Sequence, residues 1–273
     1  MNRGLDGKVV LITGASAGIG EALARRMAAQ GASLMLMARR VERLEALAAE
    51  LGAGGARVRV HAGDVTRAED LEAAVAAATR EFGRLDIAIA NAGFGVAGRF
   101  EALTEADYLR QFDTNVLGVL RTLRASRSEL LRNRGSFVIM GSVAGYVGLP
   151  GSSAYSMSKF AIRAFADAMH GELHPHGVAV TLISPGFITS EIRKIDNAGA
   201  LHARATDPVP AWIRMDADVA ARRMAGAIVR RRREVIVTAH GKLIVLIARF
   251  APWIFHLLAA RGVRGRPQPA TEA

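Results

Sequence analysis

Short apolar runs alternate with longer amphipathic segments along most of the 273-residue chain. The apolar runs have the length and the Val, Ile and Leu content of buried strands. They are residues 8–13 (KVVLIT), 33–38 (SLMLMA), 57–62 (RVRVHA), 85–90 (LDIAIA), 135–140 (GSFVIM), 178–183 (VAVTLI) and 234–238 (EVIVT). Segments of helical length include residues 19–30, 41–51, 68–82, 105–131 and 153–174. This alternation predicts right-handed βαβ crossovers, and hence an α/β fold with one doubly wound parallel sheet of about seven strands and helices on both faces.

The alternation of apolar and amphipathic segments continues along most of the chain, which indicates the domain organisation. Apolar segments and 28 glycines run from end to end, and 51% of the residues are hydrophobic. We find no fixed-period repeat and no long linker, so we predict one globular domain over residues 1–240. Residues 241–273 form an apolar and basic C-terminal extension, and we expect its polar end, RGRPQPATEA, to fray.

The formal net charge of +11 is uneven, because residues 216–273 hold eleven Lys or Arg against four Asp or Glu, a balance of +7. A basic surface favours nucleic acid or an anionic membrane. We expect no nucleic acid, because the chain has no aromatic-interleaved basic groove, zinc-finger spacing or RNP-like motif. The chain has no cysteine, which excludes disulfides and thiolate metal sites, and we expect no metal ion. The N-terminus lacks a secretory signal, so we expect a cytoplasmic protein.

A glycine-rich turn, TGASAGIG, follows the first apolar run and opens the first helix. Glycines there let the backbone bend tightly and let a pyrophosphate approach the amide groups at the positive end of a helix. A tight strand-to-helix connection without a ligand would use the same glycines, and the spacing G-x-x-x-G-x-G is not the commoner G-x-G-x-x-G. We favour the dinucleotide interpretation, because a strand precedes the turn and a helix follows it. The predicted cofactor contacts in this turn are Gly14, Ser16, Gly18, Ile19 and Gly20.

The second strand ends in MARR, at the place where an NAD-binding domain usually presents an acid to the ribose 2′-hydroxyl. Here that place holds Ala38, and Arg39 and Arg40 follow it. A solvated surface pair is the alternative, but two arginines at the start of a helix oppose its dipole. An arginine fork suits a 2′-phosphate well. We therefore predict NADP(H) as the cofactor, with Arg39 as the main contact.

Further motifs follow the later strands in order. They are Asp64 after the third strand, NAG (Asn91–Gly93) after the fourth, Asn115 in FDTNVLG, Ser142 after the fifth, YSMSK (Tyr155–Lys159) and PGFIT (Pro185–Thr189) after the sixth. Together with TGASAGIG, the chain resembles the classical short-chain dehydrogenase/reductase (SDR) family over about residues 5–240. The resemblance implies a single Rossmann-like domain and an oxidoreductase of the EC 1.1.1 type.

Tyr155 and Lys159 lie four residues apart and share one face if residues 153–174 form a helix. An exposed pair without a role is the alternative for an isolated Y-x-x-x-K. A free tyrosine has a pKa of about 10, but a nearby ammonium and an oxidised nicotinamide both favour the phenolate. The resemblance implies that Tyr155 exchanges a proton with the substrate oxygen, and that Lys159 assists it and holds the nicotinamide ribose.

Ser142 and Asn115 complete the family's catalytic tetrad. By resemblance, the Ser142 hydroxyl hydrogen-bonds the substrate oxygen and Asn115 holds a water in a proton relay from Lys159. The alternatives are an ordinary turn serine and a buried packing amide whose hydrogen bonds are satisfied.

The resemblance also assigns supporting cofactor contacts. Asp64 would accept from the adenine amino group, or it would cap a helix that begins near Arg67, and Val65 would pack on the ring. Thr189 would bind the nicotinamide carboxamide. The supporting set is Asp64, Val65, Asn91, Gly93, Pro185, Gly186 and Thr189, with Tyr155 and Lys159 also touching the cofactor.

Residues 187–215 occupy the place of the family's substrate lid. Apolar residues in this lid and on the opposite wall favour a lipophilic ketone, aldehyde or secondary alcohol, while a lid that closes only on its own core is the alternative. The lid residues are Phe187, Ile188, Ile192, Trp212, Ile213 and Met215, and those of the opposite wall are Phe94, Val143, Val147 and Leu149.

Residues 242–260 (KLIVLIARFAPWIFHLLAA) are more apolar than a typical surface helix. Arg249 and Pro252 near the centre argue against a membrane span. Two interpretations stay open: a helix in the interface of a membrane, at its inner face, or packing against the sheet or a second subunit.

These observations predict an NADP(H)-dependent carbonyl reductase, reversible as an alcohol dehydrogenase, that acts on a small apolar molecule. One alternative is a regulator or scaffold that binds NADP(H) without turnover, and another is a membrane-attached reductase of lipid metabolism. The resemblance also implies a homodimer or homotetramer that assembles through residues 105–131 and 153–174.

Overall fold

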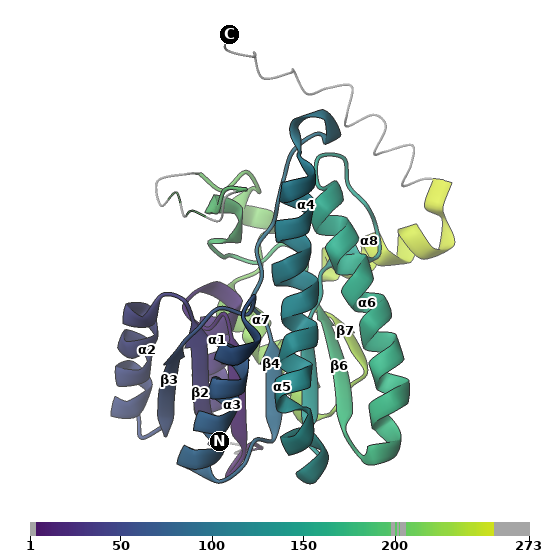
Figure 1. Cartoon of the computed structure of the whole chain (residues 1–273). Helices are drawn as coiled ribbons and strands as arrows, with labels where there is room; N and C mark the ends of the chain where they lie inside the picture. The colour runs from purple at the N-terminus through teal and green to yellow at the C-terminus, as the bar shows by residue number, and fades with distance from the viewer. Residues whose placement is uncertain (1–3, 198–199, 201, 203–205, 254–273) are drawn as a thin grey trace.

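The computed structural model describes residues 4–197, 200, 202 and 206–253 (Figure 1). Seven parallel strands form one sheet in the order β3-β2-β1-β4-β5-β6-β7, which confirms the predicted fold. The strands are β1 (Val9–Thr13), β2 (Ser33–Ala38), β3 (Val58–Ala62), β4 (Ile87–Ala90), β5 (Ser136–Met140), β6 (Ala179–Ser184) and β7 (Glu234–Ile236). The order reverses between β1 and β4, so the crossovers on either side of this point leave a crevice at the carboxyl ends of these two strands.

Helices cover both faces of the sheet (Figure 1). One layer holds α1 (Gly18–Ala28), α2 (Val41–Ala53) and α7 (Ala217–Val229), and the other holds α3 (Ala68–Phe82), α5 (Gly118–Arg132) and α6 (Ser153–Leu173). Side chains along each strand alternate between the layers, as the pleat requires. In β1, for example, Val10 and Ile12 pack in the α1 layer, whereas Val9 and Leu11 pack in the α3 layer.

The helix predicted over residues 105–131 is interrupted. It consists of α4 (Glu105–Phe112), a π-helical turn over Asp113–Leu117, and α5. The turn carries Asn115, whose buried amide bonds the main chain of Phe94 instead of pointing along the helix surface. π-helical turns inside α-helices are frequent at functional sites, and this one places the Asn115 amide beside the exit of β4.

The last described helix, α8 (Ala239–Phe250), lies at the edge of the molecule beyond β7 and projects from its body (Figure 1). It covers the first part of the predicted extension, and residues 254–273 lie outside the described residues. Within the described part of the chain, no helix is both long and apolar enough to cross a membrane.

Candidate active site

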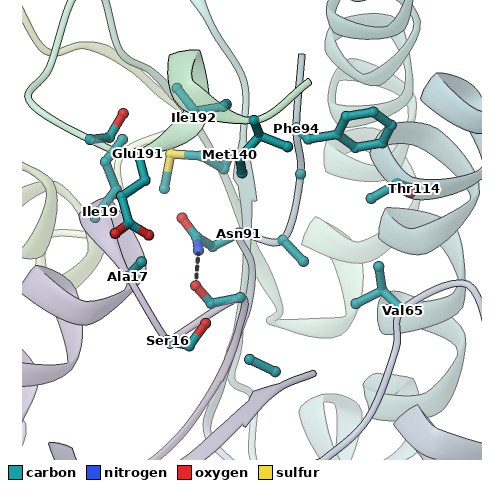
Figure 2. Close-up of a pocket in the computed structure, with 18 of the residues that line it drawn as sticks. Ser16, Ala17, Ile19, Val65, Asn91, Phe94, Thr114, Met140, Glu191 and Ile192 are labelled. Atoms are coloured by element: carbon teal, nitrogen blue, oxygen red, sulfur yellow. Dashed lines mark hydrogen bonds between the residues drawn. The ribbon is translucent and has the colours of Figure 1, made fainter. Parts of the chain in front are cut away.

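A cavity of about 720 Å³ lies at the carboxyl ends of the strands, where β1 and β4 meet. Its walls come from the loops after β1 to β5, from the start of α6 and from the segment after β6 (Figure 2). This is the crevice in which an open α/β sheet binds its ligands.

The glycine-rich turn forms the floor of this cavity, and contacts along the turn require its glycines. Gly14 has φ +67, and a Cβ atom there would lie 2.7 Å from Ala92 Cα. A Cβ on Gly20 would lie 2.4 Å from the carbonyl oxygen of Gly14. The Asn91 amide fixes the turn by donating to the carbonyls of Thr13 at 2.9 Å and Gly14 at 3.1 Å.

The turn and α1 together fit the pyrophosphate of a dinucleotide. Helix α1 begins at Gly18 with Ala17 as its N-cap, and no side chain accepts from its first amide groups. Uncapped amides at the positive end of a helix that faces a cavity suit an anionic oxygen. Gly18 has φ +58, and a Cβ atom there would lie 3.2 Å from the Ser190 Cβ, so the backbone at the start of α1 favours glycine.

Two arginines stand at the far end of the cavity, beyond β2. Arg40 donates to the Ser16 hydroxyl at 3.3 Å, whereas the more exposed Arg39 lies 3.7 Å from the Asp64 carboxylate. Asp64 itself accepts from the Thr66 amide at 2.9 Å, and α3 begins only at Ala68. The helix-cap interpretation of Asp64 is therefore wrong, because its carboxylate closes a local turn before the helix starts.

Ser142, Tyr155 and Lys159 come together at the opposite end, above β5. The start of α6 presents Tyr155 and Lys159 on one face, and the Lys159 ammonium lies 5.6 Å from the centre of the Tyr155 ring. The Lys159 Nζ donates to the Met140 carbonyl at 2.8 Å. The hydroxyl of Ser142 accepts from the Ala144 amide at 3.1 Å.

Burial controls the protonation of both ionisable groups. It raises the pKa of Tyr155, although the Ser142 hydrogen bond and the positive charge of Arg193 act in the opposite direction. Burial also lowers the pKa of Lys159 from 10.5 to about 8. The Tyr155 phenol is therefore protonated at neutral pH. Lys159 is cationic there, because its pKa of about 8 still lies above neutral pH.

Asn115 lies behind the cavity wall and organises it. Its Oδ1 accepts from the Phe94 amide at 3.1 Å, and its Nδ2 donates to the Phe94 carbonyl at 3.0 Å and to the Ser158 hydroxyl at 3.3 Å. A Cβ on Gly93 would lie 3.0 Å from Asn115 Oδ1, which explains the glycine in the NAG motif. These contacts fit the packing-amide interpretation, and the water relay stays a prediction.

The exit of β6 is packed against the start of α8. The Phe187 amide donates to His240 Nε2 at 3.1 Å, and the two rings stack with their centres 5.5 Å apart. A Cβ on Gly186 would lie 2.3 Å from the Thr238 hydroxyl oxygen, so only glycine fits there. Burial lowers the pKa of His240, which keeps its ring neutral and able to accept this hydrogen bond.

The cavity gathers most of the predicted cofactor and catalytic residues, and two lie elsewhere. Asn115 is buried behind the wall, and the exposed Thr189 lines a smaller neighbouring hollow. The predicted residues that line the cavity are Gly14, Ser16, Gly18, Ile19, Gly20, Arg39, Asp64, Val65, Asn91, Gly93, Ser142, Tyr155, Lys159, Pro185 and Gly186.

The predicted substrate walls are only partly found at the cavity. Phe94, Ile188 and Ile192 line it, but Val143 and Val147 are buried and the Trp212 side chain is 85% exposed. Further residues that the sequence did not suggest also line the cavity, among them Met140, Glu191, Arg193 and Ile195. Polar residues in irregular segments follow no periodic pattern, so only their contacts identify them.

Comparison with known proteins identifies the family to which the chain is similar. The family model for short chain dehydrogenases matches residues 8–200. The 11-beta-hydroxysteroid dehydrogenase 1A of Arabidopsis thaliana is 41% identical over 190 residues, which are 69% of this chain and 54% of the plant protein. The chain thus spans about half the length of that relative.

Solved structures of short-chain dehydrogenases also resemble this chain. The alcohol dehydrogenase of the archaeon Thermococcus sibiricus, complexed with 5-hydroxy-NADP, is 31% identical with a TM-score of 0.73, over 84% of this chain and 95% of that one. A short chain dehydrogenase/reductase from Burkholderia phymatum in complex with NAD has a TM-score of 0.81 over 98% of this chain and 99% of that one. At 24% identity, this second structure supports the fold alone.

Proposed function

This chain belongs to the short-chain dehydrogenase family, and from that premise we propose that it is an NADP(H)-dependent carbonyl reductase of lipophilic substrates. One observation carries the proposal. A single cavity has an uncapped helix end and arginines at one end, and a tyrosine, a serine and a buried lysine at the other. The first end suits a phosphorylated nucleotide, and the second suits proton exchange with a carbonyl or alcohol.

The nicotinamide, when bound, supplies or accepts the hydride. In the proposed reduction, the Tyr155 hydroxyl donates its proton to the substrate oxygen, which Ser142 also hydrogen-bonds. The raised pKa of Tyr155 supports this direction, because a protonated phenol is the required acid. Lys159, held by the Met140 carbonyl, stabilises the phenolate that remains, and it would hold the nicotinamide ribose. In the oxidation of an alcohol, Tyr155 accepts the proton instead.

The preference for NADP(H) rests on the charges beyond β2. Arg39 and Arg40 both line the cavity, and no carboxylate follows β2 at the place where an NAD-binding domain usually has one. A guanidinium binds a phosphate with two parallel hydrogen bonds, which a 2′-hydroxyl cannot match. The Thermococcus relative is a complex with an NADP derivative, which is consistent with this proposal.

A lipophilic substrate is supported by apolar side chains in the lining of the cavity that holds Tyr155. Phe94, Ile188, Ile192 and Ile195 line the same cavity, and apolar side chains in a cavity wall favour a lipophilic ligand. The name of the Arabidopsis relative includes a hydroxysteroid, a lipophilic secondary alcohol. We propose ketones, aldehydes and secondary alcohols of this character as substrates.

A substrate panel tests this function. Ketones and aldehydes of increasing chain length and bulk are incubated with the protein, and the loss of NADPH absorbance is followed, with NADH in parallel. We expect turnover that increases with apolar bulk and prefers NADPH. No oxidation of either cofactor across the panel would instead favour a regulator that binds NADP(H) without turnover.

A membrane-attached reductase is a second candidate, supported by the surface of α8. Three large apolar side chains of α8 and a fourth just beyond its end are each more than half exposed, and the exposed Lys242 and Arg249 belong to the same helix. This combination favours the interface of an anionic bilayer, which we place at the cytoplasmic face of a membrane. The four side chains are Leu243, Leu246, Phe250 and Trp253.

Liposome flotation tests the second candidate. The full chain should float with vesicles that contain anionic lipid, and Leu246→Glu together with Phe250→Glu should remain at the bottom of the gradient. Both changes lie on exposed side chains, so we expect the doubly substituted protein to fold and to reduce the same water-soluble substrates. Equal flotation of the two proteins would contradict the membrane candidate.

We propose a homodimer or homotetramer that forms through the helices beside the cavity. Leu109 of α4, Leu117 of the π-helical turn, and Met157 and Phe160 of α6 are each at least 42% exposed. Exposed apolar side chains on neighbouring helices favour a subunit interface. Light scattering coupled to size exclusion tests this, since Phe160→Glu should shift the particle toward the mass of a single chain.

A further inference from the structure

Glu191 links three parts of the cavity wall. It lies in the segment that follows β6, and its carboxylate accepts hydrogen bonds from Arg40 at 3.1 Å and from Arg43 at 2.8 and 3.0 Å. Arg40 donates from its other terminal nitrogen to Ser16 in the glycine-rich turn. One carboxylate therefore connects the segment after β6 to the start of α2 and, through Arg40, to the turn that we assign to the pyrophosphate.

The segment around Glu191 lies directly over that turn. A Cβ atom on Gly18 would be 3.2 Å from the Ser190 Cβ, so the two backbones nearly touch. The base of the segment is fixed independently of Glu191, because the Thr189 amide donates to the Met215 carbonyl at 3.0 Å. Glu191 is thus the contact that holds the far part of this segment against α2.

Glu191 is ionised at neutral pH. Burial alone would raise its pKa, but the hydrogen bonds from Arg43 and Arg40 hold the pKa below the usual range of a glutamate. The side chains are partly exposed, with 33% for Glu191, 36% for Arg40 and 44% for Arg43. Ion pairs of this exposure are weak and exchange partners readily.

We propose that Glu191 is a specificity-determining residue that competes with the 2′-phosphate of NADP(H) for Arg40 and Arg43. The inference rests on the proposed function and names how the same site selects its cofactor. A phosphate monoester carries nearly two negative charges and three acceptor oxygens, so it displaces a single carboxylate from the arginines. The 2′-hydroxyl of NADH is uncharged and leaves the Glu191 contacts in place.

The competition predicts a selective effect of Glu191→Gln, which keeps the size of the side chain and removes its charge. Adenosine 2′,5′-bisphosphate and AMP are the probes, since they differ only in the 2′-phosphate and require no turnover. Isothermal titration should show that Glu191→Gln binds the bisphosphate about fivefold more tightly, because two partly exposed ion pairs no longer oppose it. AMP affinity should stay within about twofold, because the 5′-phosphate is common to both probes.

Glu50→Gln is the matched control. Glu50 also accepts two hydrogen bonds from an arginine, Arg25, and lies on the helix surface outside the cavity lining. Glu50→Gln should change neither the affinity for the bisphosphate nor the affinity for AMP. An unchanged ratio of the two affinities in Glu191→Gln, or weaker binding of the bisphosphate, would overturn the proposal.

Hydrogen exchange without nucleotide separates this inference from the proposed function. In Glu191→Gln, the amides of residues 190–195 should exchange faster than in the wild-type protein, because this part of the segment loses its contact with α2, whereas the Thr189 amide, which is bonded to Met215, should not change. Equal exchange in the two proteins overturns the role of Glu191 whatever the cofactor is. A wild-type protein that binds AMP as tightly as the bisphosphate overturns the proposed preference for NADP(H), and with it the competition for the phosphate. In that case, faster hydrogen exchange in Glu191→Gln would still establish that Glu191 holds the segment against α2.

Discussion

At the scale of single residues, the proposed chemistry depends on two groups that burial shifts in opposite directions. Burial raises the pKa of Tyr155 and lowers that of Lys159 to about 8. The sequence suggested that the ammonium would favour the phenolate, but in this structure desolvation outweighs other influences and both groups are shifted toward their neutral forms. A phenol that holds its proton is suited to reduction, and the lysine charge is retained at neutral pH in spite of its environment.

Lys159→Met should therefore increase stability while it abolishes turnover. The buried ammonium has only the Met140 carbonyl as its protein hydrogen-bond partner within the described part of the chain, so methionine removes the desolvation penalty. We expect the free energy of unfolding in urea at pH 7 to rise by about 1–3 kcal/mol.

The pH dependence provides a check on this prediction. Between about 8 and 10.5 the unfolded lysine keeps its proton while the folded one loses it, so the stability of the wild-type protein should rise with pH in this window. The advantage of Lys159→Met should shrink over the same window. A variant that is less stable at pH 7 would show that the ammonium stabilises the fold.

Arg39 and Arg40 should control the choice of cofactor. A charged hydrogen bond to phosphate contributes about 1.5–3 kcal/mol, so Arg39→Ala should raise the KM for NADPH by about tenfold to hundredfold. The KM for NADH should change little, because its ribose carries no charge there. Arg57→Ala, directly before the start of β3, serves as the control, since its guanidinium packs on the Phe82 ring outside the cavity. Equal changes for both cofactors would contradict the assignment.

At the scale of elements, local sequence patterns predicted the strands and most helices. A strand that is buried on both faces of the sheet has a short run of apolar residues, and a helix that covers the sheet has apolar residues at helical spacing. Helix α3 has the predicted bounds, Ala68–Phe82, and Gly83 ends it in the left-handed conformation. The π-helical turn around Asn115 could not be predicted from local pattern. It depends on hydrogen bonds to Phe94, which lies 21 positions away in the chain and beyond the end of β4.

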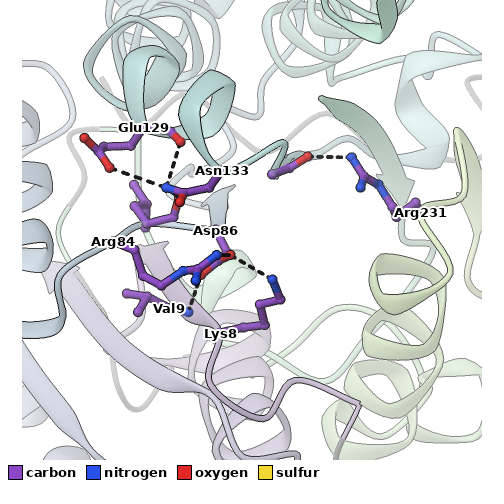
Figure 3. Close-up of polar contacts among 9 residues, drawn as sticks. Lys8, Val9, Arg84, Asp86, Glu129, Asn133 and Arg231 are labelled. Atoms are coloured by element: carbon purple, nitrogen blue, oxygen red, sulfur yellow. Dashed lines mark hydrogen bonds and ion pairs between the residues drawn. The ribbon is translucent and has the colours of Figure 1, made fainter. Parts of the chain in front are cut away.

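Polar contacts at the amino ends of the strands hold elements together on the side of the sheet away from the cavity (Figure 3). The Asp86 carboxylate, next to the start of β4, accepts from Lys8, from Arg84 and from the Val9 amide. Asp86 is 3% exposed. Burial alone would raise the pKa of Asp86, but hydrogen bonds from Arg84, Val9 and Lys8 hold it below the usual range. This carboxylate therefore ties β1 to β4 at the edge opposite the cavity.

Asp86→Asn should lower stability without changing catalysis. Breaking a buried, hydrogen-bonded charge pair is expected to reduce the free energy of unfolding by about 3 kcal/mol at pH 7. Because the folded pKa of Asp86 is depressed, its contribution is present above 3.8 and is lost as pH falls through the folded pKa. The difference between wild type and variant in urea unfolding should thus shrink in acid, while kcat/KM at neutral pH stays equal. A marked loss of kcat/KM in a folded variant would show that this cluster influences the cavity.

At the scale of the whole molecule, the sequence revealed the residues of the site that belong to ordered motifs. The glycine-rich turn could be predicted because it joins a strand and a helix that the local sequence pattern reveals. The Tyr155–Lys159 pair could be predicted because its four-residue spacing lies within a recognisable helix. Glu191 was missed, since it is 151 positions from its partner Arg40 in the chain and lies in a segment without periodicity. The far end of the extension, residues 254–273, lies outside the described residues, and its predicted membrane contact stays a prediction.

The most direct measurement of the central claim compares Tyr155→Phe with the wild-type protein for both turnover and NADPH binding. Tyr146→Phe is the matched control, because its hydroxyl bonds Ser184 at 3.0 Å and it does not line the cavity. Loss of the proton donor should lower kcat by about 10²–10⁴-fold. NADPH affinity, followed by fluorescence, should stay close to that of the wild type, and Tyr146→Phe should retain turnover. A Tyr155→Phe protein that reduces its best substrate at the wild-type rate would contradict the account.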